Sequence, residues 1–421
     1  MLTLSDRITD ERVHGSLYTD QAVYQQEMDR IFRMGWLFAG HASEIPQPGD
    51  YVTRDIAGEP LILSRTVEGE IRVLFNRCAH RGNRVCVLDQ GNATSYRCHY
   101  HGWTYRNDGQ LSGIPFAKGY EEPLEDLRKS MSMAPVPRSE VRHGFVFVSL
   151  AEDGPDLDTH MGDGGLDMLA RLSGMSPTGE ISLGKGWLHH RLGANWKAVM
   201  ENQVDGYHVQ FTHASLFEGA SGPRKGITYG QKSGAAVRDL GRGHSEILFE
   251  AEHRRQDQEF LWIGSATRAK LPEYSRAMVE AYGEEEAHDR FVAGPPHGVI
   301  FPNLFLAEFN IFVVEPVSAG VTNSWTAAIT IPGCDDISLR QLRRSEAAMG
   351  PAGMLIADDS EIAERNQAGF GANQPEWVDL TRGRAGVVPD PELSYAQLDP
   401  DLTGELPQRA FWRQYKSLMV S

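Results

Sequence analysis

Long apolar runs, cysteine and positive charge are all scarce in this sequence of 421 residues. No apolar run approaches the roughly 18 residues that a membrane helix needs, and the first residues lack the apolar core of a signal peptide. Lys and Arg number 41 against 57 Asp and Glu, which gives a formal net charge of −16. Nucleic acid and anionic membranes reward clustered positive charge, so neither is expected as a main partner. We expect a cytoplasmic protein without a membrane segment.

The first half of the chain changes from a helical pattern to short β-type runs. Residues 18–34 predict an amphipathic helix that begins after a cap at Thr19 or Asp20. Between residues 50 and 150, β-branched runs alternate with turns, which is typical of a small all-β domain. The length of the chain leaves room for one or two further domains.

The second half predicts strands with helices packed alongside, an α+β arrangement. Residues 151–180 are rich in Gly, Asp and Ser and predict a connector with one short helix. The acidic residues Asp156, Asp158 and Asp163 lack the spacing of a calcium loop, so a solvated loop is expected there. Strands are expected at 187–192, 297–301, 305–314 and 324–331, and helices at 268–292, 336–348, 352–368 and 405–419.

Two loops each carry one cysteine and one histidine. Cys78 and His80 form a C-x-H pair, and after seventeen residues Cys98 and His101 form a C-x2-H pair. Such a set can hold zinc, or a [2Fe–2S] cluster in which two histidines replace two cysteines on one iron. Zinc fingers usually pair like ligands, whereas a mixed pair on each loop favours the cluster. The other two cysteines, Cys86 and Cys334, are expected to be buried thiols rather than a disulfide.

A second metal site is indicated by His208 and His213, which are close enough in sequence to bind one ion. With a carboxylate they would form the 2-His-1-carboxylate face that leaves positions open on ferrous iron. Two histidines near a helix end are by themselves more often surface or core residues. The pair becomes a metal-site candidate because it accompanies the Cys-His loops.

Nearly the whole chain resembles the α subunit of Rieske non-haem iron ring-hydroxylating oxygenases. The resemblance lies in the Cys-His loops, in Glu201-Asn202 through Asp205, His208 and His213, and in Gly350-Pro351-Ala352-Gly353 followed by Asp358-Asp359. It implies that Asp359 is the carboxylate ligand, with Asp358 and Glu361 as alternatives. It also implies that Asp205 connects the mononuclear iron to a cluster histidine, His80 or His101, of a neighbouring subunit. The α subunits would then form a head-to-tail ring.

The resemblance further implies a division of the chain and a fold. Residues 1–37 would be a helical segment packed on the catalytic domain, 38–155 an all-β Rieske domain, and 156–421 a catalytic mononuclear-iron domain. The catalytic domain would be α+β, an antiparallel sheet with helices of the helix-grip or START-like kind. Its cofactors would be a Rieske [2Fe–2S] cluster and Fe(II), with electrons from NAD(P)H delivered through a ferredoxin or flavin reductase.

The implied activity is hydroxylation of an aromatic substrate with O2, and foremost cis-dihydroxylation in aromatic catabolism. The implied assembly is an α3 ring, or an α3β3 assembly with a small β subunit. Mono-oxygenation, O- or N-demethylation, a Rieske electron carrier and a zinc-stabilised binding module are the alternatives.

Two residues, Gln203 and Val204, separate Asn202 from the bridging Asp205 in this chain, whereas some family members have three residues at this place. Candidate pocket residues are Gln203, Phe211, Leu216, Phe217, Phe301 and Asn303. A basic collar for the electron donor is expected at Arg77, Arg81, Arg84, Arg97 and Arg106.

Overall fold

A computed structural model describes residues 2–215, 234–256 and 258–420. The chain divides into two compact units, one made of residues 33–154 and the other of residues 1–32 with 155–421. The division into three domains, residues 1–37, 38–155 and 156–421, stays a prediction. Within the described residues, no helix is long and apolar enough to cross a membrane.

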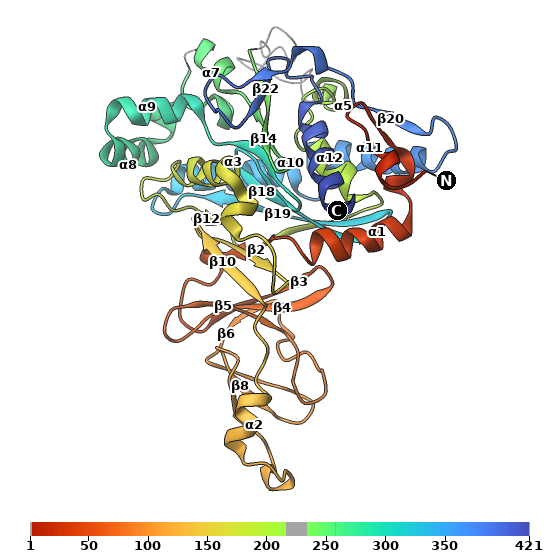
Figure 1. Cartoon of the computed structure of the whole chain (residues 1–421). Helices are drawn as coiled ribbons and strands as arrows, with labels where there is room; N and C mark the ends of the chain where they lie inside the picture. The colour runs from red at the N-terminus through yellow and green to blue at the C-terminus, as the bar shows by residue number, and fades with distance from the viewer. Residues whose placement is uncertain (1, 216–233, 257, 421) are drawn as a thin grey trace. The chain divides into compact units, whose positions relative to one another are not determined.

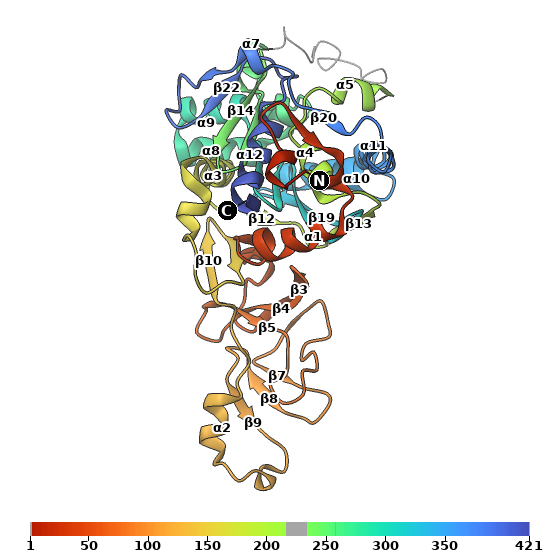
Figure 2. The ribbon, with the colours of Figure 1, turned by 45° about the vertical axis from the view of Figure 1, so that its right-hand side comes forward.

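The unit of residues 33–154 is built from three small antiparallel sheets, in the strand orders β10-β11-β2, β5-β4-β3-β6 and β7-β8-β9. The first and last of these lie at opposite ends of the unit, with the four-stranded sheet between them (Figures 1 and 2). The strands are β2 (Leu37–His41), β3 (Asp50–Ile56), β4 (Glu59–Arg65), β5 (Ile71–Phe75), β6 (Gln90–Asn92), β7 (Ser95–Arg97), β8 (Thr104–Arg106), β9 (Leu111–Gly113), β10 (Arg138–Arg142) and β11 (Phe145–Ser149). The helical segments are η4 (Ala42–Glu44), η5 (Ala117–Gly119) and α2 (Leu124–Ser130).

The two Cys-His loops leave from strands of these sheets. One loop connects β5 to β6, and the other connects β7 to β8. Cys78 and Cys98 belong to one buried core that also contains Ile62, Trp103 and Tyr105. The loops are therefore fixed at their bases by packed strands, which suits a rigid metal site.

The other unit is organised around one antiparallel sheet. Its order is β12-β19-β18-β17-β16-β15-β14-β22-β21, and β13 also pairs with β19. The strands are β12 (Ser182–Leu183), β13 (Leu188–Leu192), β14 (Ala236–Gly241), β15 (His244–Leu248), β16 (His297–Ile300), β17 (Leu304–Leu306), β18 (Asn310–Ser318), β19 (Val321–Thr330), β21 (Val388–Pro389) and β22 (Gln397–Asp399). A separate pair joins β1 (Arg12–His14) to β20 (Trp377–Asp379).

Helices cover this sheet (Figure 1). α3 packs against β14, β15 and β16, α10 against β19, and α12 against β14 and β15. The helices are α1 (Gln21–Glu27), α3 (Leu157–Ser173), α4 (Trp196–Asn202), α5 (Val209–Thr212), α7 (Glu250–Gln256), α8 (Pro272–Tyr282), α9 (Glu284–Ala293), α10 (Asp335–Met349), α11 (Met354–Phe370) and α12 (Leu406–Val420). A π-helical turn, η3 (Met28–Phe32), follows α1, and short 3₁₀ turns are η1 (Ser5–Arg7), η2 (Gly15–Tyr18), η7 (Leu261–Ile263), η8 (Arg268–Lys270) and η9 (Arg384–Gly386).

The predicted fold class, an all-β domain with an α+β domain, is confirmed, and three local predictions were wrong. The helix expected at 268–292 is two helices, because Gly283 adopts a φ of +83° between them. The strand expected at 305–314 is interrupted between β17 and β18. The acidic connector contains α3, which is kinked at Gly162, where φ is +55°. The N-cap of α3 is Asp156, whose side chain accepts the Thr159 N–H at 2.7 Å.

Candidate metal centres

The two Cys-His loops have the same backbone hydrogen bonds. The Cys78 N–H donates to the Asn83 carbonyl, and the Cys98 N–H donates to the Trp103 carbonyl, each five residues on. In each loop the glycine four residues after the cysteine, Gly82 or Gly102, returns a bond to the cysteine carbonyl.

Both glycines have a positive φ, +72° and +74°, a backbone conformation that other residues adopt at a cost. A Cβ at Gly82 would lie 3.2 Å from Nε of Arg77, and one at Gly102 would lie 3.3 Å from an Arg97 guanidinium nitrogen. The arginine that precedes each cysteine thus packs over the glycine of its own loop. The two loops form a matched pair, as a site with one cysteine and one histidine from each loop requires.

The four predicted cluster ligands lie together at these loops. Cys78 and Cys98 are buried thiols, and the rings of His80 and His101 are 4.5 Å apart. The His80 ring stacks on Trp103 at 4.8 Å, while its Nδ1 atom is buried without a hydrogen-bond partner. A buried ring nitrogen without a partner is costly in a protein, and a metal ion would satisfy it. The donor set therefore fits a cluster with two thiolates on one iron and two imidazoles on the other.

Hydrogen bonds also reach the two cysteine sulfurs. The Tyr105 hydroxyl lies 3.1 Å from Sγ of Cys78, and the Asn83 amide nitrogen lies 3.7 Å from Sγ of Cys98. Burial disfavours the Cys98 thiolate, but the backbone N–H of Tyr100 and neighbouring donors outweigh this effect and lower the pKa of the thiol. Donors placed around a sulfur stabilise the thiolate form that binds iron.

The second predicted centre comes together from two distant parts of the chain. His208 and His213 flank the short helix α5, and Asp359 lies on α11. One ligand atom from each of the three lies within 4.8 Å of the others. Asp359 Oδ1 is 3.6 Å from Nε2 of His208 and 3.2 Å from Nε2 of His213. Two imidazoles and one carboxylate converging on one point match the donor set of mononuclear ferrous iron.

The neighbouring acids have separate contacts. Asp358 Oδ2 lies 3.2 Å from Nδ1 of His213, the ring nitrogen that faces away from Asp359. Glu361 instead pairs with Arg365 at 2.7 Å on the exposed side of α11. Burial disfavours the charged form of His213, but Asp359 and Asp358 outweigh this effect and raise its pKa. The carboxylates thus create a negative field that suits a cation.

Two residues from α4 and the turn after it support the same centre. Asn202 donates from Nδ2 to Asp359 Oδ1 at 3.1 Å. Asp205 Oδ1 accepts the N–H groups of Tyr207 at 2.6 Å and His208 at 3.1 Å, and lies 3.7 Å from Nδ1 of His208. Burial opposes ionisation of Asp205, but its contacts with His208 outweigh this effect and lower its pKa. The supporting roles of Asn202 and Asp358 were not predicted, although both lie within the motifs that the sequence displays.

The candidate pocket residues have different surroundings. Gln203 caps the end of α4, and Phe301 is buried between Trp196 and Phe411. Phe211 is 69% exposed, and Asn303 is buried. Leu216 and Phe217 lie outside the described residues. Phe301 is thus a core residue, and the aromatic pattern alone did not distinguish it from a pocket residue.

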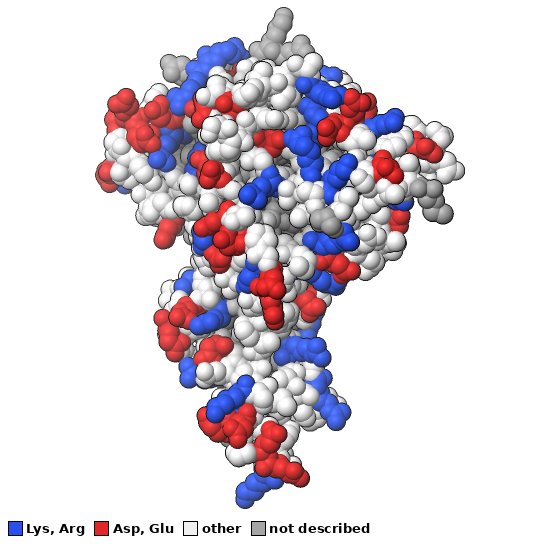
Figure 3. Space-filling model, in the orientation of Figure 1, with Lys and Arg blue, Asp and Glu red and all other residues white. Residues whose placement is uncertain are grey.

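The five collar arginines are all exposed, and they differ in their ion pairs. Arg84 pairs with Asp55 at 2.7 Å, and Arg106 pairs with Glu68 and Asp108. Arg77, Arg81 and Arg97 make no ion pair within the described part of the chain. On the face shown in Figure 3, acidic and basic side chains are interspersed rather than gathered into one field of a single sign.

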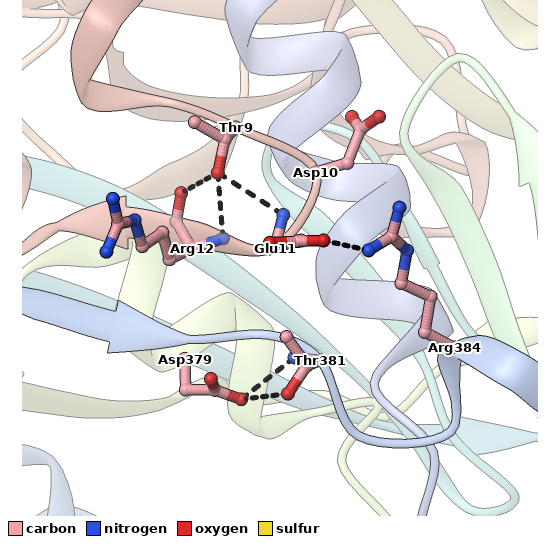
Figure 4. A pocket seen from close by; sticks show the side chains of 7 residues that line it. All are labelled: Thr9, Asp10, Glu11, Arg12, Asp379, Thr381 and Arg384. Atoms are coloured by element: carbon pink, nitrogen blue, oxygen red, sulfur yellow. Dashed lines mark hydrogen bonds and ion pairs between the residues drawn. The ribbon is translucent and has the colours of Figure 1, made fainter.

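A surface pocket of about 470 Å³ is lined by residues of the segments 9–12 and 379–384. Figure 4 shows that its polar side chains bond to one another: Glu11 pairs with Arg384, and the Thr381 hydroxyl donates to Asp379 at 2.6 Å. It contains none of the predicted metal ligands.

Two protein families match this chain, and each match lies within one of the two compact units. Residues 35–128 match the family described as Rieske [2Fe-2S] domain, and residues 182–419 match the ring hydroxylating alpha subunit (catalytic domain). The N,N-dimethyl phenylurea N-demethylase subunit alpha of Sphingobium sp. (strain YBL2) is 30% identical, over 98% of this chain and 93% of that protein. The naphthalene 1,2-dioxygenase large oxygenase component of Pseudomonas aeruginosa is 31% identical, over 96% and 89%.

Solved structures agree with the fold. Naphthalene 1,2-dioxygenase with indole bound in the active site matches with a TM-score of 0.82 and 26% identity, covering 98% of this chain and 92% of that one. A quaternary ammonium Rieske monooxygenase matches with a TM-score of 0.71 at 18% identity, which shows the shared fold. The cofactors are therefore a Rieske [2Fe–2S] cluster and a mononuclear iron, with electrons from NAD(P)H through a reductase. The chain belongs to the family of ring-hydroxylating oxygenase alpha subunits, the large oxygenase components of multicomponent oxidoreductases.

Proposed function

We propose that this subunit adds both atoms of O2 to an aromatic ring to give a cis-dihydrodiol in aromatic catabolism. Cys78, His80, Cys98 and His101 would hold the Rieske cluster, and His208, His213 and Asp359 the mononuclear iron. The observation that carries the proposal is the convergence of these last three side chains within 4.8 Å in a chain that also has the matched Cys-His loops.

The mononuclear iron, once bound and reduced, supplies the activation of O2 beside the substrate. The protein's own residues hold this centre in place. Asp358 fixes the ring of His213, and Asn202 fixes Asp359 through Oδ1. Asp205 holds the turn that carries His208 by accepting two backbone N–H groups. Such supporting contacts orient ligands and usually matter nearly as much as the ligands themselves.

The proposal includes a neighbouring copy of the chain. Asp205 Oδ2 has no hydrogen-bond partner among the described residues, and the Asp205 side chain is 32% exposed. It is therefore available to accept an N–H from His80 or His101 of another subunit, which supports an α3 ring, alone or as α3β3. A cytoplasmic location belongs to the same proposal, because the electrons originate from NAD(P)H.

The electron donor is a ferredoxin or a flavin reductase that docks near the cluster. Arg77, Arg81 and Arg97 surround the Cys-His loops without ion pairs among the described residues. An acidic donor surface would complement these charges and would be steered toward the cluster.

Labelled oxygen tests the proposed reaction. The purified holoenzyme, supplied with reductase and ferredoxin, is incubated with naphthalene under 18-O2, and products are analysed by mass spectrometry. A dihydrodiol with two labelled oxygens is expected. Asp359→Asn should abolish the product, and an exposed control, Glu286→Gln on α9, should retain it. A product with one labelled oxygen would overturn dihydroxylation.

Oxidative N-demethylation is the second candidate. It is supported by the N-demethylase subunit from Sphingobium, which is 30% identical over 98% of this chain. An N,N-dimethyl phenylurea under the same conditions would lose a methyl group as formaldehyde. Formaldehyde production without any dihydrodiol from naphthalene would favour this candidate.

A further inference from the structure

A histidine–glutamate pair lies on the sheet of the catalytic domain, beside the helix that leads to the iron ligands. His297 begins β16, and Glu308 lies in the break between β17 and β18. Nδ1 of His297 is 3.4 Å from Oε2 of Glu308. None of the chemistry proposed above uses this pair.

The orientation of His297 follows from the alternation of side chains along β16. The next residue, Gly298, faces α3, because a Cβ there would lie 2.6 Å from Sδ of Met168. His297 therefore points to the opposite face of the sheet. On that face its Nε2 lies 3.2 Å from the carbonyl oxygen of Gln203, at the end of α4.

A continuous series of contacts joins the pair to the iron centre. Gln203 directly follows Asn202, which donates to the proposed iron ligand Asp359 at 3.1 Å. His297 contacts the backbone of Gln203 and in turn faces Glu308. The pair is thus separated from the proposed ligand Asp359 by one peptide, that of Gln203, and one side chain, that of Asn202.

Aromatic rings surround the pair, and part of it remains open. Phe249 and Phe305 pack edge-on against the His297 ring, with centroids 5.5 and 4.9 Å away. The side chains of His297 and Glu308 nevertheless each remain 20% exposed. A mostly apolar surface with a small number of placed polar groups is typical of a small-molecule site.

Glu308 is charged and has spare acceptor capacity. Burial opposes its ionisation, but His297 and Arg344 outweigh this effect and lower the pKa of Glu308 to about 2. The described groups that contact its carboxylate are His297, at 3.4 Å, and the backbone N–H of Glu308 itself. Gln341 bonds to the Glu308 backbone carbonyl instead. A carboxylate can accept several hydrogen bonds, so at least one position is open to a ligand.

We propose that Glu308, oriented by His297, accepts a hydrogen bond from an N–H or O–H group on the aromatic substrate. The inference rests on the proposed function and narrows its substrate class to arenes that carry a hydrogen-bond donor. A carboxylated arene would meet the Glu308 charge and is disfavoured. Plain hydrocarbons would bind without this hydrogen bond.

Binding of two compounds of equal shape tests the inference. Indole carries an N–H where indene carries a CH2. Their dissociation constants are measured by calorimetry on oxidised, anaerobic holoenzyme, so that no turnover occurs. Indole is expected to bind about tenfold more tightly, since hydrogen bonds to charged acceptors are among the stronger ones. Glu308→Met removes the acceptor and should bring this ratio toward one, and Glu286→Gln should leave it unchanged.

Two results would overturn the inference: equal or undetectable binding of indole and indene by the wild-type enzyme, or an indole preference that survives in Glu308→Met. Benzoate adds an independent measurement, because it should bind more tightly to Glu308→Gln than to the wild type, and the reverse order would contradict the charge argument. Thermal unfolding of each variant shows that the fold is retained. The 18-O2 experiment tests the reaction separately, so loss of the dihydroxylation proposal and loss of the donor preference are distinguishable.

Discussion

Asp358 and Asp359 are adjacent in sequence, yet their carboxylates have different partners. Successive side chains on a helix point about 100° apart, so only one of two neighbouring acids can face a given point. Asp359 faces the Nε2 atoms of both histidines, while Asp358 faces Nδ1 of His213. The sequence motif indicated the acidic pair, and the resemblance favoured Asp359. The contact between Asp358 and His213 depends on how α11 packs against α5, which no spacing in the sequence reveals.

Asp358→Asn is expected to weaken iron binding while leaving the fold intact. Asparagine has the same shape but cannot stabilise the His213 ring through a charge, and losses of this kind usually cost about 10- to 100-fold in metal affinity. Iron content after dialysis against a graded chelator series gives the measurement. Glu361→Gln, which removes an exposed acid three residues away, should keep its iron. Equal iron retention by both variants would contradict a supporting role for Asp358.

The Tyr105 hydroxyl is expected to raise the potential of the Rieske cluster. It lies 3.1 Å from Cys78 Sγ, and hydrogen bonds to cluster sulfurs stabilise the reduced, more negative form. Tyr105→Phe should lower the midpoint by about 60 mV, the equivalent of about 1.4 kcal/mol for one electron. An EPR-monitored redox titration measures it. Tyr96→Phe is the control, because the Tyr96 hydroxyl bonds to Ser64 in the same core; a similar shift in both variants would argue against a specific bond.

At the scale of elements, periodicity located half of the catalytic sheet, β13 and β16 to β19, and several of its helices, but it missed β14 and β15. The helix expected at 336–348 is α10, and the one expected at 405–419 is α12. The errors have physical causes. Gly283 breaks a continuous helical pattern with its positive φ, and α3 was hidden because its acidic and glycine-rich sequence has low helix propensity. Tertiary packing against β14 to β16 stabilises α3 despite that propensity.

The buried charges that join three helices could not be predicted from any local pattern. Glu27 ends α1 and Lys197 lies on α4; both side chains are fully buried, with 2.5 Å between Oε1 and Nζ. Tyr415 of α12 and Trp196 of α4 also donate to Glu27, at 2.6 and 2.9 Å. The ion pair therefore fixes α1 and α12 to the helix that supplies Asn202.

Breaking this ion pair on one side is expected to be strongly destabilising. Lys197→Met leaves the Glu27 carboxylate buried without its cation, which typically costs about 3–5 kcal/mol. The double variant Glu27→Gln/Lys197→Met should recover part of that loss, because no uncompensated charge remains. Calorimetric unfolding midpoints of the wild type, both single variants and the double variant give the comparison. A double variant with a lower midpoint than either single variant would contradict the argument.

At the scale of the whole molecule, the net charge is negative, whereas the side chains that crowd the Cys-His loops are positive. The chain carries a formal charge of −16, yet five arginines crowd the Cys-His loops. The sequence revealed the crowding but not which arginines are neutralised. Arg84 and Arg106 pair with acids on neighbouring strands and loops, whereas Arg77, Arg81 and Arg97 do not within the described residues. Any electrostatic docking of a donor must therefore depend chiefly on the unpaired three.

Reduction of the cluster by an acidic ferredoxin is expected to slow as salt is added. Screening shortens the range of exposed charges to about 10 Å at 0.1 M salt, so the second-order rate should fall on the order of tenfold between about 0.05 and 0.5 M. Stopped-flow absorbance of the cluster measures this rate. Arg81→Gln should lower it at low salt and flatten its salt dependence, since one steering charge is lost. Arg72→Gln, in the same unit but already paired with Glu70 at 2.7 Å, should behave like the wild type. A wild-type rate that is independent of salt would mean that apolar or backbone contacts, rather than these arginines, bring the donor to the cluster.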